Sequence, residues 1–359
     1  MKRLLMLLPA LAFTHCAPEI PPTQQTTTPL NPARDYRPVD GDPTVDDVAR
    51  FLAGRPVEHG AALARWQMRD GDYHTHALVM DSRWRNAGRK RAVAQAQFYY
   101  TTTRNAIGNP STVVYPFGGP DILHATSMFP KASTYVLLGL ESVGSVPDFS
   151  AGVSKPMLAD LAGVLEAPIL HGYFITETMR QSPPATPILL TSLGIMGARV
   201  DSISAIDAGG RPGVEIRFRG PQGGSKRVLY VSADLSNRGF DSSFQSWLNR
   251  YSGGAAYFKA ASYLPHDSAF SSVRQWVLSH AKVVLQDDSG IPFKDFDPGT
   301  WETTLLGNYE RPIPLFANFR QPDLAAAYDA AAGRTPSIPF GSGYHMRAAE
   351  ANLQIQRRR

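Results

Sequence analysis

The chain has 359 residues, of which 43% are hydrophobic and 19% charged, and 36 Lys and Arg against 31 Asp and Glu give a net charge of +5. This composition excludes a chain too polar to bury a core. The 30 glycines and 29 prolines follow no period, which excludes a collagen-like fibre. Five of the positive charges lie at the two ends of the chain, on Lys2, Arg3, Arg357, Arg358 and Arg359. Because the body is close to neutral, we expect no nucleic-acid partner.

The N-terminus has the layout of an export signal. Lys2 and Arg3 precede an apolar segment at residues 4–13, and the only cysteine, Cys16, follows it. A membrane-spanning helix needs about 20 apolar residues, so this segment is too short to span a bilayer. The sequence therefore predicts an exported protein, in the periplasm or outer membrane, with residues 1–16 as its signal.

Two routes of signal processing stay open. The stretch that ends at Cys16 resembles a bacterial lipoprotein signal, which implies lipidation of that cysteine, although His15 stands where such signals carry a small residue. The alternative is ordinary cleavage after Ala12. Residues 17–37 are rich in Pro and Thr and are predicted to form a disordered tether, which favours the lipoprotein. A lipid anchor at Cys16 would then be the membrane contact of the mature protein.

The rest of the chain, residues 38–359, is predicted to form one globular domain with a helical lead-in. A short helix is expected at residues 45–53, with Thr44 as its N-cap. Apolar side chains at intervals of three and four residues predict longer helical structure at residues 59–96.

The central part changes to short β-rich runs, so that the expected fold class is mixed α/β with an antiparallel meander. Apolar runs at 112–117 and 133–140 enclose a helical segment at 121–129, which is the order of a βαβ unit. Further elements are expected in chain order as a helix at 155–180, meander strands at 200–206, 214–219 and 227–233, a helix at 242–250, a strand at 257–264, a helix at 268–280 and a strand at 282–286.

Three motifs carry a resemblance to a known family. They are Tyr115-Pro-Phe-Gly-Gly-Pro-Asp121, Thr134-Tyr-Val-Leu-Leu-Gly-Leu-Glu141 and Leu285-Gln-Asp-Asp-Ser-Gly-Ile-Pro292. Together they resemble a family of bacterial exported proteins and lipoproteins for which we know of no assigned activity. The resemblance implies a bacterial origin and one body that spans the motifs. It supplies no catalytic residues.

The first of these motifs is also the first candidate site. Gly118 and Gly119 form a turn whose backbone N–H groups can face an anion, and Asp121 and His124 would share a helix face as a base or as ligands. The structural alternative is that the glycines make a tight turn and that Asp121 caps the helix.

The second candidate site lies at the end of the strand expected at 282–286. Asp287 and Asp288 stand where α/β proteins place ligands, with Ser289 beside them, and adjacent carboxylates can hold a divalent metal or activate water. The structural alternative is a turn in which Asp288 and Ser289 bond their own backbone and Gly290 supplies a positive φ. His266 would face the acidic pair if the strand that precedes it neighbours this one.

Two functions fit these observations. A binding or structural lipoprotein of the cell envelope, with an unidentified partner or small ligand, is favoured because no complete catalytic motif is present. The alternative is an exported hydrolase that uses Asp121, Asp287 and Asp288, with His124 or His266, around a metal or an activated water. A divalent metal is a cofactor only in this second function. Convergence of the three aspartates in one place would favour the hydrolase.

Overall fold

Nine strands form one mixed sheet in the computed structural model. The structure describes residues 35–36, 42–149, 154–174, 183–221 and 223–359. The strands are β1 (Thr112–Tyr115), β2 (Thr134–Gly139), β3 (Arg199–Asp207), β4 (Pro212–Arg219), β5 (Ser225–Ser232), β6 (Ala255–Phe258), β7 (Val283–Gln286), β8 (Trp301–Gly307) and β9 (Asn352–Arg358).

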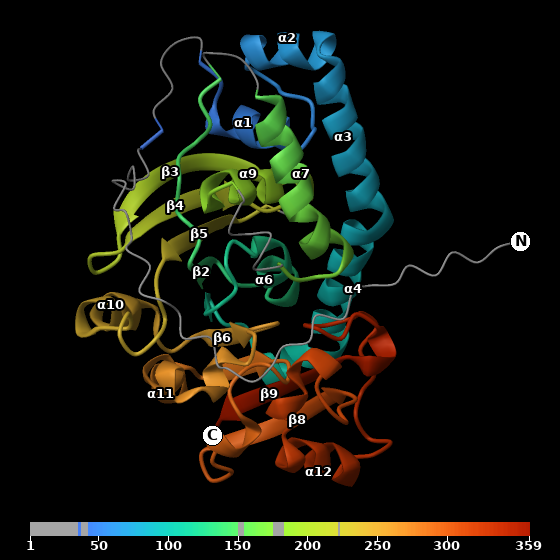
Figure 1. Cartoon of the computed structure of the whole chain (residues 1–359), viewed down its shortest axis with the longest axis vertical. Helices are drawn as coiled ribbons and strands as arrows, with labels where there is room; N and C mark the ends of the chain where they lie inside the picture. Colours follow the sequence, from blue (N-terminus) through green and yellow to red (C-terminus); the bar gives the residue numbers. More distant parts are fainter. Residues whose placement is uncertain (1–34, 37–41, 150–153, 175–182, 222) are drawn as a thin grey trace, which may run out of the picture. The chain divides into compact units, whose positions relative to one another are not determined.

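The centre of the sheet is parallel and both of its edges are antiparallel. The strand order is β3-β4-β5-β2-β1-β6-β7-β9-β8 (Figure 1). Strands β5, β2, β1, β6 and β7 run parallel, whereas β3 and β4 extend one edge and β9 and β8 the other by antiparallel pairing. The mixed α/β class and the antiparallel meander predicted from the sequence are confirmed.

Helices lie on both faces of this sheet. They are α1 (Val45–Leu52), α2 (Ala61–Arg69), α3 (Gly71–Arg83), α4 (Arg89–Phe98), α5 (Arg104–Ile107), α6 (Ile122–Met128), α7 (Lys155–Leu170), α9 (Ala185–Met196), α10 (Ser242–Leu248), α11 (Ser271–His280) and α12 (Pro322–Ala330), with π-helical turns η1 (Trp84–Gly88) and η2 (Tyr99–Thr103) on either side of α4.

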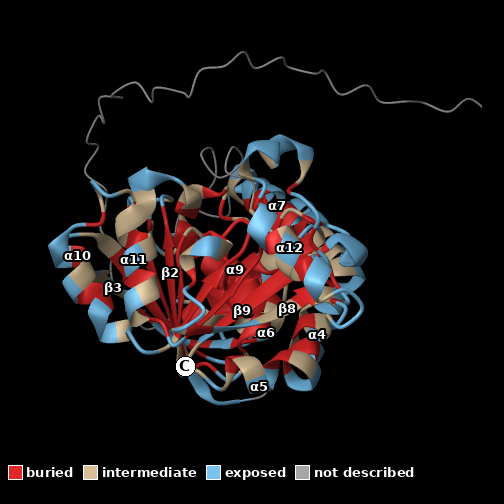
Figure 2. Ribbon diagram, turned by 90° about the horizontal axis from the view of Figure 1, so that it is seen from below, coloured by how far each residue is buried: buried red, intermediate tan, exposed pale blue. Residues whose placement is uncertain are grey.

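Alternation along the strands builds a separate core on each face. In β1, Val113 and Tyr115 join the core under α1, α3, α6, α7 and α9, whereas Val114 joins the core under α10 and α11. Figure 2 shows the buried residues in the strands and on the helix faces turned toward them. Burial on both faces explains why the central strands are continuous apolar runs.

Several sequence predictions need correction. The strand predicted at 257–264 ends at Phe258, because the backbone enters the left-handed region at Ala260, Ser262 and Tyr263. The strands β8 and β9 and the helix α12 were not predicted. The helix predicted at 155–180 is observed as α7, which ends at Leu170, and the last six residues of the prediction lie outside the described part of the chain.

The predicted signal with Cys16 and almost all of the predicted tether lie outside the described residues. The described residues from 35 to 359 belong to one compact unit by their internal contacts. Among the described helices, none has the length and apolar character needed to span a membrane.

Candidate functional site

The candidate site lies where the strand order of the sheet reverses. The chain passes from β1 to β2 and β5 on one side, whereas β6 and β7 lie on the other side of β1. Ligands of α/β proteins bind beyond the carboxyl ends of the strands at such a point. Three loops leave these ends, at residues 116–121 after β1, 259–263 after β6 and 287–290 after β7.

Asp121 and His124 form a buried pair at the start of α6. One carboxylate oxygen of Asp121, Oδ1, accepts a hydrogen bond from the backbone N–H of His124 at 3.3 Å, so Asp121 does cap the helix. The same oxygen lies 2.8 Å from Nδ1 of the His124 ring. Asp121 is 2% exposed and His124 is 4% exposed. The cap therefore also holds the imidazole in one orientation.

The other carboxylate oxygen of Asp121 binds a cation from the loop after the neighbouring strand, β6. Lys259 Nζ donates to Asp121 Oδ2 at 2.6 Å, and the hydroxyl of Tyr115 donates to the same oxygen at 3.1 Å. Lys259 was not a predicted site residue. The sequence feature that could have indicated it is that Lys259 is the one lysine within the apolar run predicted as a strand at 257–264. Lys259 and Asp121 form a buried ion pair across the point of reversal.

Burial and the neighbouring charges shift the pKa of each member of this group. Burial alone would raise the pKa of Asp121, but His124 and Lys259 outweigh it and hold that pKa below its usual value. Burial lowers the pKa of His124 to about 4, against the opposing effect of Asp121. Burial also lowers the pKa of Lys259, and Asp121 again opposes the shift. At neutral pH, Asp121 is therefore ionised and His124 is neutral.

This charge state determines which ring nitrogen of His124 is free to act as a base. An ionised carboxylate accepts a proton and does not donate one, so we assign the proton of the neutral ring to Nδ1, facing Asp121. The lone pair is then on Nε2. A Cβ atom placed on Gly172 would lie 3.5 Å from His124 Nε2 and 3.0 Å from Nη1 of Arg91. A side chain at position 172 would therefore contact the Nε2 edge of the His124 ring, and glycine provides none.

A small gap borders the same group. Its volume is about 10 Å³, which is close to the space that one water molecule needs. His124, Arg91 and Ser127 contribute polar side chains to its lining, and Trp84 contributes an aromatic one. Arg91 is held there by hydrogen bonds from its guanidinium to the carbonyl oxygen of Leu170 at 2.8 Å and to that of Ile169.

The glycine turn before Asp121 is a structural turn. Gly119 has a φ of +54°, and its N–H donates to the carbonyl oxygen of Leu138 at 3.3 Å. A Cβ on Gly119 would lie 3.2 Å from a carboxylate oxygen of Glu141, and a Cβ on Gly118 would lie 2.6 Å from the ring of Tyr115. With one N–H bonded and a carboxylate beside it, the turn gives no support to the anion site predicted at Gly118 and Gly119.

Asp287 organises the turn after β7. Its Oδ1 accepts from the N–H of Ser289 at 2.9 Å and from the Ser289 hydroxyl, and its Oδ2 accepts from the N–H of Ala260 at 2.8 Å. The predicted turn therefore exists, but Asp287 and not Asp288 bonds the backbone. Gly290 does not have the predicted positive φ. It packs on Gln286, whose Oε1 would lie 2.6 Å from a Cβ at position 290.

Asp288 is held by side chains from distant parts of the chain. Tyr263 donates its hydroxyl to Asp288 Oδ2 at 2.5 Å, and Asn352 donates to Oδ1 at 3.1 Å. His345 Nε2 lies 3.5 Å from Oδ1, and the charge and hydrogen-bonding influence of Asp288 outweighs burial and raises the pKa of His345. The carboxylate of Asp288 is therefore fully engaged within the protein.

Asp287 has an unusual pKa, and His266 lies close to Tyr263, which binds the other acid, Asp288. Burial and the neighbouring charge of Asp288 raise the pKa of Asp287 to about 6. The ring of His266 packs 5.2 Å from the ring of Tyr263, and β6 neighbours β7 as the prediction for His266 required. Burial lowers the pKa of His266 to about 4.

The two acidic motifs meet at the loop after β6. Lys259 in this loop binds Asp121, and the next residue, Ala260, binds Asp287. Among the described residues, positive φ values at residues other than glycine occur only at Phe117, Ala260, Ser262 and Tyr263, all in the loops after β1 and β6. Backbone strain of this kind is concentrated at functional sites.

The metal site predicted at Asp287 and Asp288 lacks further ligands. In the described part of the chain, no three His, Cys, Asp or Glu side chains are grouped so that they could hold a metal ion. Both carboxylates already accept hydrogen bonds from Ser289, Ala260, Tyr263 and Asn352. We therefore assign no step to a metal.

The chain was compared with protein-family models, with curated proteins and with solved structures, and none of the three comparisons gave a match. The case for a function consequently rests on the geometry of the loops after β1, β6 and β7.

Proposed function

We propose that this protein is an exported hydrolase of the bacterial cell envelope that cleaves an ester with a water molecule activated by Asp121 and His124. The observation that carries the proposal is the buried Asp121–His124 pair at the point where the strand order reverses, with Lys259 bound to the same carboxylate. Titratable groups with shifted pKa values are concentrated at functional sites, and buried charges are retained where they serve a purpose.

The proposed chemistry follows from the tautomer of His124. Its Nε2 accepts a proton from water while the water oxygen attacks the carbonyl carbon or phosphorus of the ester. Asp121 accepts the Nδ1 hydrogen bond and stabilises the imidazolium that forms. The imidazolium then returns the proton to the departing alkoxide, so the products are an acid and an alcohol and His124 is neutral again.

Two cations support this step. Lys259 balances the charge of Asp121 in the buried group. Arg91 lines the gap of about 10 Å³ together with His124, so its positive charge lies beside the space that the attacking water can occupy.

The shifted pKa of His124 gives the expected pH dependence. Because the pKa of His124 in the folded protein is about 4, its imidazole is neutral and available as a base across the neutral range. The rate of hydrolysis should therefore fall only as the pH is lowered toward 4, and it should lack the usual fall near 6.5 of an unshifted histidine.

The test is an assay of the purified protein on p-nitrophenyl acetate, p-nitrophenyl phosphate and bis(p-nitrophenyl) phosphate. We expect turnover of at least one ester and a loss of 100-fold or more in His124→Gln. His76→Gln is the matched control, because His76 is also buried, 6% exposed, and its ring contacts the carbonyl oxygen of Leu52 in the helical layer, away from the loops after β1, β6 and β7. Absence of turnover, or equal losses in the two variants, would contradict the proposal.

A binding or structural envelope protein is the second candidate. It is favoured by the complete internal bonding of the carboxylates of Asp287 and Asp288, which is typical of groups that fix loops. In that case the wild-type protein hydrolyses none of the three esters, and His124→Gln changes its stability alone.

Export is part of the same proposal and has its own test. Expression of the full chain in a bacterium, followed by intact-mass measurement of the mature protein, distinguishes a lipidated N-terminus at Cys16 from cleavage after Ala12. A chain that keeps Met1 and stays in the cytoplasm would contradict export.

A further inference from the structure

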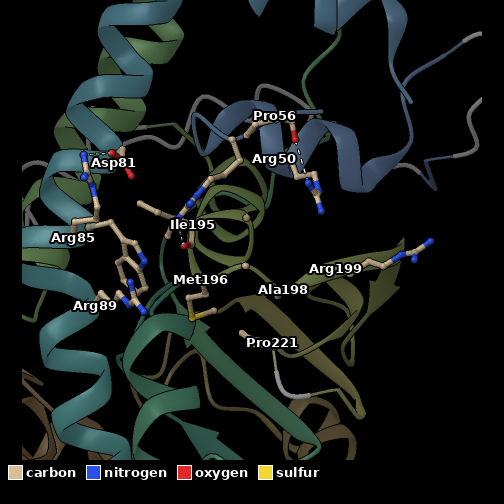
Figure 3. Close-up of a pocket in the computed structure, with 14 residues that line it drawn as sticks. Arg50, Pro56, Asp81, Arg85, Arg89, Ile195, Met196, Ala198, Arg199 and Pro221 are labelled. Carbon is tan, nitrogen blue, oxygen red and sulfur yellow. Dashed lines mark hydrogen bonds and ion pairs between the residues drawn. The ribbon is translucent and has the colours of Figure 1, made fainter. Parts of the chain in front are cut away.

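A hollow much larger than the gap beside His124 is lined by residues outside the loops after β1, β6 and β7. It has a volume of about 570 Å³ and lies between α1, the α3–η1–α4 junction and the end of α9 with the start of β3 (Figure 3). A volume of 300–1,000 Å³ is typical of pockets for small molecules. Its charged lining consists of Arg50, Arg55, Arg85, Arg89, Arg199 and a single acid, Asp81.

Three of the five arginines have partners within the protein. Arg50 pairs with Asp46 and Glu58, which lie outside the lining, and Arg85 pairs with Asp81. Arg55 donates to the carbonyl oxygen of Ile195 at the end of α9, at 3.2 Å. That contact fixes the guanidinium of Arg55 against the end of α9, within the lining of the pocket.

The other two arginines are available to a ligand. Arg89 and Arg199 are exposed, and none of the carboxylates in the described residues pairs with either of them. The three negative charges of Asp46, Glu58 and Asp81 balance three of the five arginine charges, which leaves two positive charges in excess. Guanidinium groups bind phosphate oxygens through paired N–H donors, so they suit a phosphorylated ligand better than a simple halide.

The pocket also has an apolar wall. Trp84, Ile195 and Met196 contribute to it, and Trp84 begins the π-helical turn η1. A Cβ on Gly88 would lie 2.4 Å from the Trp84 ring, so the indole packs directly on the backbone one turn later. Turns of the π type within α-helices are frequent at functional sites. Here the turn places Trp84 and Arg85 side by side on the pocket.

We propose that this pocket binds a phosphorylated small molecule that carries at least two negative charges and a flat apolar group. Arg89 and Arg199 bind the phosphates, Arg55 supports them from the floor of the pocket, and the flat group packs against Trp84 and Met196. This binding site goes beyond the proposed hydrolase and does not depend on it, because none of these residues belongs to the loops after β1, β6 and β7. Of the residues assigned to the ligand, Trp84 alone also lines the gap beside His124.

Titration calorimetry at 0.15 M salt with two probes, ATP and inorganic pyrophosphate, tests the proposal. We expect saturable binding of ATP, weaker binding of pyrophosphate, and a loss of tenfold or more for ATP in the double variant Arg89→Ala, Arg199→Ala. The matched control is Lys90→Ala, Arg238→Ala, which removes the same charge from exposed positions outside the pocket.

The outcomes separate the parts of the proposal. A control variant that keeps its ATP affinity within twofold supports a specific site, whereas equal losses in both variants would show general charge attraction and overturn it. Absence of saturable binding of both probes to the wild-type protein would also overturn it. Equal affinity for the two probes would contradict the part assigned to Trp84.

Discussion

The two charged regions of this molecule hold their charged side chains under opposite physical conditions. At the loops after β1, β6 and β7, Asp121 and Lys259 are almost fully buried and paired with each other. In the pocket at the end of α9, Arg89 and Arg199 are exposed and have no carboxylate partner in the described part of the chain. A buried charge needs its partner for the protein to fold, whereas an exposed one can be reserved for a ligand. Substitutions should therefore affect stability in the first region and binding in the second.

The largest expected effect is that of Lys259→Met. This change leaves the Asp121 carboxylate buried without its cation, and loss of one partner of a buried pair typically costs about 3–5 kcal/mol. We expect a destabilisation of this order in urea unfolding at pH 7.

The control for Lys259→Met is Lys155→Met. Lys155 pairs with Asp72 at the surface, where its side chain is 68% exposed, and its loss should leave the unfolding midpoint unchanged. The double variant Asp121→Asn, Lys259→Met should recover part of the stability. Equal midpoints for the two lysine variants would break the comparison.

The pH dependence of stability provides a second test. The pKa of His124 is about 4 in the folded protein and about 6.5 in the unfolded chain, so protons favour the unfolded chain as the pH falls from 6.5 to 4. The wild-type protein therefore loses stability across this window, by up to about 3 kcal/mol from this group. His124→Gln lacks that loss.

The measurement is the difference in free energy of unfolding between wild type and His124→Gln at pH 7 and at pH 4.5. The difference should be smaller at pH 4.5. Asp287, with its raised pKa, acts in the opposite direction, but it is present in both proteins and cancels. A constant difference would indicate that His124 is not desolvated.

A glycine pair sharpens the description of the pocket wall. Gly88→Ala would force the new Cβ against the Trp84 ring, and such overpacking typically costs about 1–3 kcal/mol. Gly163→Ala in α7 has no atom within 4 Å of its Cβ and should stabilise the helix by about 0.5–1 kcal/mol. Thermal unfolding of both variants measures the difference, and the same sign for both would refute the close packing of Trp84.

The smallest expected effect is that of the double variant Arg89→Ala, Arg199→Ala on stability. Both side chains are exposed and have no partner among the described carboxylates, so the free energy of unfolding should change by no more than about 0.5 kcal/mol. Urea unfolding in the absence of phosphate checks this expectation. A loss of several kcal/mol would mean that these arginines serve the fold and not a ligand.

The sequence predicted the fold class because the apolar runs of the central strands and the spacing of the helices are local signals. Asp121 and Asp287 were found because each follows such a run. Lys259 was missed because its partner is 138 residues away, and only the pairing of β1 with β6 brings the two together. The strand β9 was missed because buried glutamines at positions 354 and 356 interrupt its apolar pattern.

The arginine pocket could not be predicted in the same way. Arg85 and Arg89 lie in the helical structure predicted at residues 59–96, but Arg55 and Arg199 come from other parts of the chain and join them only in the folded structure. The metal hypothesis for Asp287 and Asp288 depended on two adjacent carboxylates at the end of a strand, whereas the structure shows which hydrogen bonds already occupy the two carboxylates.

The most direct test of the central claim is the ratio of ester hydrolysis rates between wild type and His124→Gln, measured at pH 7 at a temperature where unfolding curves show both proteins to be folded. The account predicts a ratio of 100 or more, together with a wild-type rate that stays constant from pH 8 down to pH 5. A ratio near one, or no hydrolysis by the wild-type protein, would contradict it and leave Asp121, His124 and Lys259 as a buried network that serves the fold.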